Sequence, residues 1–84
     1  MINCEKIKNL CIEFLKNNGA KPWQYLDGYF ITPNGHKFSF DCSGDVFAIF
    51  HRVSEWGEKQ NFFEWNNDPN LEEKALDFIK SKIK

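Results

Sequence analysis

The chain has 84 residues, of which 42% are hydrophobic and 27% are charged, and its formal net charge is −1. This length suits one domain, 1–84, and is too short for two separate cores. The balanced charge excludes a general attraction to nucleic acid or to anionic membranes. Since no apolar run reaches membrane-spanning length and no signal-peptide pattern is present, a soluble cytoplasmic protein is expected.

The three cysteines cannot all pair with one another. Cys4 and Cys11 lie seven residues apart on a predicted helix, which separates them by about 10 Å, beyond the reach of a disulfide. Reduced thiols, as in the cytosol, are therefore expected. No metal site is predicted, because the spacings typical of zinc ligands, Cys-x-x-Cys and His-x-x-x-His, do not occur.

The N-terminal residues 3–18 are expected to form a helix. Apolar side chains recur there at intervals of three and four, which is typical of a helix with one buried face. This stripe consists of Cys4, Ile7, Leu10, Cys11, Phe14 and Leu15. Gly19 supplies the left-handed residue that commonly ends a helix. A short strand at residues 23–26 is predicted next, followed by an Asp27-Gly28 turn.

Residues 29–50 predict two consecutive hairpins. In the first turn, Thr32-Pro33-Asn34-Gly35, proline has the right φ for a type I turn and glycine takes the left-handed position. Asp41-Cys42-Ser43-Gly44 repeats this pattern without the proline. Two three-residue loops with a bulge are therefore expected.

This predicted register assigns the side chains to two faces of the sheet. Phe30 pairs with Phe38, Phe38 with Ala48, and Phe40 with Val46. The face expected in the core comprises Phe30, Phe38, Phe40, Val46, Ala48 and Phe50. The face expected to remain open comprises Tyr29, Ile31, Lys37, Ser39, Phe47, Ile49 and His51. Because open sheet faces usually carry polar residues, the apolar half of this face predicts a contact surface.

After this pair of hairpins, residues 51–60 predict a loop and residues 61–65 a final short strand. Asn70 and Glu73 form a capping-box pattern at the start of a second amphipathic helix. The complete order predicts an α+β fold. We expect an antiparallel sheet of three to five strands, with the N- and C-terminal helices packed on one face.

The order of helix, three strands and helix is similar to that of the double-stranded-RNA-binding domain. Gly35-His36, just before a strand, also resembles a loop of that family. The family grips phosphate with lysines at the start of its last helix. The matching positions here are acidic and repel phosphate: Asp68, Glu72, Glu73 and Asp77. The resemblance therefore implies a fold and makes direct binding of nucleic acid unlikely.

Residues 55–77 combine seven acidic residues and only two lysines with several aromatic side chains. Aromatic rings surrounded by charge are typical of protein interfaces. No nucleophile elbow, phosphate loop or paired-carboxylate motif occurs, so we predict a non-enzymatic protein without a cofactor.

The predicted function is a small protein-binding module, specifically an inhibitor that covers the basic nucleic-acid-binding surface of a larger protein. Small viral anti-defence inhibitors, including anti-CRISPR proteins, are similar in size and character. Alternatives are a homodimer formed through the open sheet faces, and a domain that binds RNA or single-stranded nucleic acid by stacking. The predicted partner-binding residues are Tyr29, Ile31, Phe47, Ile49, Trp56, Glu58, Glu64, Trp65, Asp68, Glu72 and Glu73.

Overall fold

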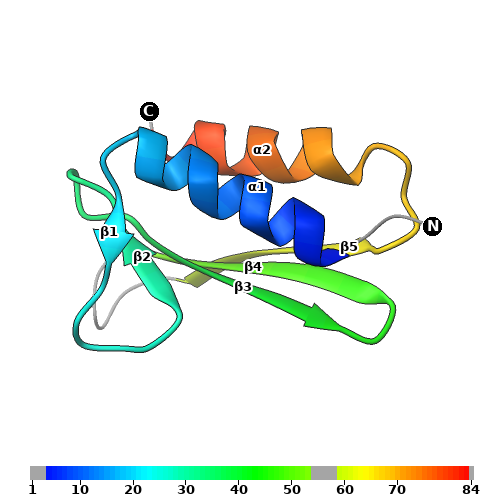
Figure 1. The fold of residues 1–84 in the computed structure, drawn as a ribbon, viewed down its shortest axis with the longest axis horizontal. Coiled ribbons are helices and arrows are strands. Elements are labelled where there is room, and N and C mark those ends of the chain that lie inside the picture. Colours follow the sequence, from blue (N-terminus) through cyan, green and yellow to red (C-terminus); the bar gives the residue numbers. More distant parts are fainter. Residues whose placement is uncertain (1–3, 54–58, 84) are drawn as a thin grey trace.

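The computed structural model describes residues 4–53 and 59–83. The chain forms an α+β fold in which a five-stranded antiparallel sheet, in the order β1-β2-β3-β4-β5, carries both helices on one face (Figure 1). The elements are α1 (Cys4–Asn17), β1 (Lys21–Pro22), β2 (Tyr29–Ile31), β3 (Lys37–Ser43), β4 (Val46–Arg52), β5 (Lys59–Trp65) and α2 (Leu71–Lys82). The predicted fold class is confirmed.

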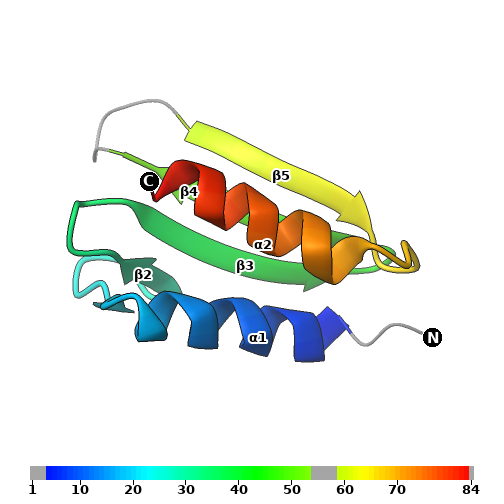
Figure 2. The ribbon, with the colours of Figure 1, turned by 90° about the horizontal axis from the view of Figure 1, so that it is seen from above.

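Both helices pack on the sheet through the apolar stripes that their periodicity predicts. α1 buries Ile7, Cys11 and Leu15, which are spaced by four residues. α2 buries Leu71, Ala75 and Ile79 at the same spacing. Figure 2 shows the two helices side by side above the strands, with β5 at the edge of the sheet beyond α2.

The turn between β2 and β3 has the predicted geometry. The Gly35 N–H donates to the Thr32 carbonyl oxygen at 3.0 Å, and the Thr32 N–H donates to the His36 carbonyl oxygen at 2.8 Å. Gly35 has a φ of 90°, in the left-handed region that glycine tolerates best. Phe30 lies opposite Phe38, as predicted.

The turn between β3 and β4 differs from the prediction. β3 continues through Ser43, which lies opposite Val46, so Gly44 and Asp45 alone form the loop. Gly44 has a φ of 58°, as the first central residue of a type II′ turn requires. Phe40 therefore pairs with Ile49 and not with Val46, and the predicted three-residue loop is wrong.

This register turns the side chains of β4 to the faces opposite to those predicted, because side chains alternate along a strand. The core face holds residues with exposed fractions of 2% or less: Phe47, Ile49 and His51. The open face holds Val46, Ala48 and Phe50. The prediction that Phe47, Ile49 and His51 lie on the open face is wrong, and so is the prediction that Val46, Ala48 and Phe50 face the helices, although Ala48 is buried with 5% of its surface exposed.

The segment before β2 is a loop and not the predicted strand at 23–26. Pairing ends at Trp23, whose N–H donates to the Tyr29 carbonyl oxygen at 2.8 Å. Gly28, with a φ of 85°, lets the chain turn back into β2. Tyr25 lies in this loop with 70% of its surface exposed.

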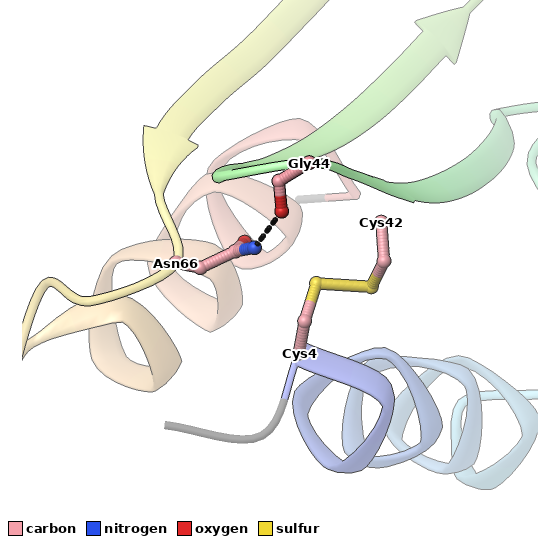
Figure 3. The surroundings of a disulfide bond; sticks show 4 residues. All are labelled: Cys4, Cys42, Gly44 and Asn66. Carbon is pink, nitrogen blue, oxygen red and sulfur yellow. Dashed lines mark hydrogen bonds between the residues drawn. A yellow bond between two sulfur atoms is a disulfide. The ribbon is translucent and has the colours of Figure 1, made fainter. Parts of the chain in front are cut away.

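A disulfide joins Cys4, in the first turn of α1, to Cys42 near the end of β3 (Figure 3). The two Cα atoms are 6.1 Å apart although 38 positions separate them in sequence. The expectation of reduced thiols throughout is therefore wrong. Cys11 is the free cysteine, and burial beneath the helix raises the pKa of its thiol to about 12.

Candidate functional site

The open face of the sheet is ordered in rows by the strand register. One end carries a row of mostly cationic positions, here called the basic row: Lys21, Ile31, Lys37 and Arg52. Aromatic positions follow along the strands, with Tyr29 and Phe50 in the next row, Phe63 in the third and Trp65 in the fourth. Polar and aromatic side chains therefore share a surface that neither helix covers (Figure 1).

The opposite end of the molecule carries acidic residues from several segments together with Trp65, which is 61% exposed. The β3–β4 turn, the β5–α2 loop and the first turn of α2 all lie at this end (Figure 1). We call it the acidic end and define it by Asp41, Asp45, Glu64, Trp65, Asp68, Glu72 and Glu73.

Lys74 neutralises part of this charge. Its Nζ donates to Asp68 Oδ2 at 2.6 Å and to Glu64 Oε2 at 3.3 Å. The hydrogen bond from Lys74 holds the pKa of Asp68 below its usual value, and Asp68 in turn raises the pKa of Lys74. Asp68 also accepts the Asn70 N–H at 2.7 Å. Because the Asn70 side chain makes no cap hydrogen bond, the predicted capping box is wrong.

Several bonds fix the acidic end. The Asn66 N–H donates to the Asp45 carbonyl oxygen, and the Asn66 side-chain amide donates to the Gly44 carbonyl oxygen, both at 2.7 Å (Figure 3). The Cys4–Cys42 disulfide ties α1 to the same region. The segments that present Trp65 are therefore cross-linked before any partner binds.

The structure divides the predicted partner-binding residues into four groups. Glu64, Trp65, Asp68, Glu72 and Glu73 come together at the acidic end. Tyr29 and Ile31 lie on the open face at the opposite end, Ile31 within the basic row and Tyr29 in the next row. Phe47 and Ile49 are 0% exposed and cannot contact a partner in the folded protein. Trp56 and Glu58 lie outside the described residues.

A pair of histidines is the least expected feature of the core face. His36 Nδ1 and His51 Nε2 are 2.9 Å apart, and their rings are stacked. His51 also contacts the Phe38 ring, at 4.8 Å between centroids. Burial, followed by the charges of His36 and Lys82, lowers the pKa of His51 to about 4. His51 is therefore buried, and does not lie on the open face where it was expected.

The described residues contain no group of three or more His, Cys, Asp or Glu side chains placed to hold a metal ion. No helix within those residues is long and apolar enough to cross a membrane. Protein-family models, curated proteins and solved structures gave no match to the chain. Its function is therefore argued from its own geometry.

Proposed function

We propose that the chain is a small non-enzymatic module that binds a protein with a basic surface through its acidic end. The supporting observation is that Trp65, with 61% of its surface exposed on the open face, lies at the end of the molecule that carries the acidic residues of the β3–β4 turn, the β5–α2 loop and the first turn of α2. Tryptophan is enriched among the residues that dominate binding energy. Opposite charge on the partner would speed association and fix its orientation.

The cross-links at the acidic end favour this proposal. A surface already held by a disulfide and by the bonds of Asn66 loses little conformational entropy on binding. An open groove of about 360 Å³ adjoins it along the outer side of α2. Three acidic residues line this groove, Glu72, Glu73 and Asp77, together with Lys80.

The specific role we propose is inhibition of a larger nucleic-acid-handling protein by covering its basic channel, as small viral anti-defence inhibitors such as anti-CRISPR proteins do. The proposed site of action is the cytoplasm. Because disulfides are rare in reducing compartments, binding should be measured for both the oxidised and the reduced protein.

Affinity capture from the source cells tests the proposal. Tagged wild-type protein, Trp65→Ala, Glu72→Lys and a control, Tyr25→Ala, are used as baits in parallel. A specific partner should be retained by wild type and control and lost by the other two baits. The captured protein is then purified, and its affinity should fall at least about tenfold for Trp65→Ala. A partner held equally by all four baits would refute the proposed surface.

Self-association is the second candidate function, and the opposite charge of the two ends favours it. Two open faces related by a two-fold axis perpendicular to the strands would bring each acidic end near the partner's basic row. Sedimentation velocity at two protein concentrations and two salt concentrations tests this dimer. A monomer under all four conditions would exclude it.

A further inference from the structure

We infer that the open face carries a second binding site, at the end opposite Trp65, that takes single-stranded nucleic acid. Its centre is Lys37 on β3 and Arg52 on β4, which lie directly opposite each other. Two like charges in this arrangement destabilise an antiparallel sheet. The fold therefore holds two cations together where local stability alone would favour a cation and an anion.

Lys37 is the more constrained of the two cations. Only 7% of the surface of Lys37 is exposed. Its Nζ donates to the carbonyl oxygens of Gly35 at 3.2 Å and of Val53 at 3.5 Å. Nζ also lies 5.1 Å from the centre of the Trp23 ring. An ammonium group has three donors, so these two carbonyl oxygens leave one N–H for a further acceptor.

Arg52 lies beside Lys37 with its guanidinium carbon 5.6 Å from the centre of the Tyr29 ring. Its Nε is buried and has no hydrogen-bond partner within the described part of the protein. Neither Lys37 nor Arg52 forms an ion pair with another of the residues 4–53 and 59–83. A planar guanidinium that no carboxylate of the described residues engages suits the two oxygens of a phosphodiester.

The aromatic neighbours of this cation pair point to nucleic acid as the ligand. Trp23 makes edge-to-face contacts with Tyr25 and Tyr29, at 5.8 and 6.0 Å between centroids. Tyr25 is 70% exposed, so its ring is accessible to a base. Cations that bind the backbone and aromatic rings that stack unpaired bases are together the composition of single-strand binding surfaces.

Charge complementarity also places this ligand at one end of the molecule. Lys16 in the last turn of α1, and Lys82 in the last turn of α2, lie at the same end as the basic row (Figure 1). The acidic end would repel phosphate. A bound strand is therefore expected to be short and to contact Arg52 and the Trp23 cluster. This contact does not require the lysines with which the double-stranded-RNA-binding domain grips phosphate at the start of its last helix.

Fluorescence anisotropy with a labelled oligo(dT) of about 12 nucleotides, at low salt, tests the inference. Wild-type protein should bind the single strand saturably and more tightly than a duplex of equal length. Arg52→Gln should weaken binding several-fold and reduce the slope of log K against log salt by about 0.7, the value of one phosphate contact on a single strand. Tyr25→Ala should weaken binding at least about fivefold through the lost stacking contact.

Lys80→Gln is the matched control, because it removes one exposed cation from α2 and leaves the open face intact. Its affinity should equal that of wild type. An equal loss for Lys80→Gln and Arg52→Gln would show a diffuse electrostatic attraction and overturn the site. Absence of saturable binding to oligo(dT), or equal binding of polyglutamate, would also overturn it, the latter in favour of an acidic protein ligand. Since Trp65 is not part of this site, Trp65→Ala should leave oligo(dT) binding unchanged.

Discussion

The wild-type protein should lose stability as the pH falls from about 6.5 to about 4. Replacing His51 with glutamine should abolish most of this loss. His51 is 2% exposed, and its Nδ1 has no hydrogen-bond partner among the described residues. Glutamine does not titrate in this range, and its amide can still bond to His36. The substitution therefore separates the titration of the buried ring from the packing around it.

The sign and size of the effect follow from the pKa of His51. Its value is lowered from 6.5 to about 4 in the folded protein, so the unfolded chain binds the proton more tightly and acid favours unfolding. At 1.36 kcal/mol per pKa unit, the complete shift corresponds to about 3 kcal/mol, most of which is lost by about pH 4.5. The stability is fully present above about pH 6.5.

Urea unfolding followed by tryptophan fluorescence, from about pH 7.5 to about pH 4.5 at constant ionic strength, measures this effect. His36→Gln is the control, because burial is the largest cause of the lowered pKa of His51 and remains when His36 is gone. It should keep most of the wild-type slope. Protonation of Asp68 also destabilises the folded protein in acid, because its pKa is lowered, but this destabilisation occurs at a lower pH than that of His51. If His51→Gln lost stability as steeply as wild type above about pH 4.5, the reasoning would be refuted.

Three further changes test the fold. Reduction of the disulfide, or Cys42→Ser, should cost about 4 kcal/mol, because the bond closes a loop of 38 positions; thermal unfolding with and without reductant measures this, and an unchanged midpoint would contradict it. Phe47→Ala should cost about 3–5 kcal/mol as a buried aromatic, whereas Phe63→Ala, at 59% exposure, should cost less than about 1 kcal/mol; equal losses in urea unfolding would put β4 in the wrong register. Gly19→Ala should cost more than about 1 kcal/mol, since φ is +88° and the new Cβ would lie 2.9 Å from Pro33 Cγ; a wild-type melting temperature would argue against this contact.

The helices and the first hairpin could be predicted because each rests on a local signal. The stripes of α1 and α2 repeat over several turns, so one irregular position does not obscure them. Pro33 and Gly35 specify a single turn type, because proline fixes φ at one position and glycine permits the left-handed region at another.

The second turn could not be predicted because Gly44 satisfies two turn types. It fits the last position of a three-residue loop and equally the first position of a type II′ turn. The following strand, Val46–Arg52, gives no further guidance, because its first five residues are apolar on both faces. Alternation identifies the buried face only where polar side chains mark the other one, as Lys37 and Ser39 do on β3.

The disulfide and the basic row depend on tertiary placement, which no local pattern contains. Cys4 and Cys42 meet only because α1 runs alongside β3, with its first turn near the end of that strand (Figure 2). Helix geometry separates Cys4 from Cys11 beyond the reach of a disulfide. It does not determine the distance between Cys4 and Cys42, because these residues lie on different elements.

The choice of which alternate residues of β4 point to the open face also determines the charge of that face. In the predicted register Arg52 would point toward the helices, and the aromatic face would carry Lys37 as its one cation. In the observed register Arg52 lies opposite Lys37 on that face, while Phe47 and Ile49 take the buried positions. The same two-residue turn at Gly44 that completes the core therefore creates the cation pair. A lengthened β3–β4 loop that restored the other parity would bury Arg52, and it should abolish folding and oligo(dT) binding together.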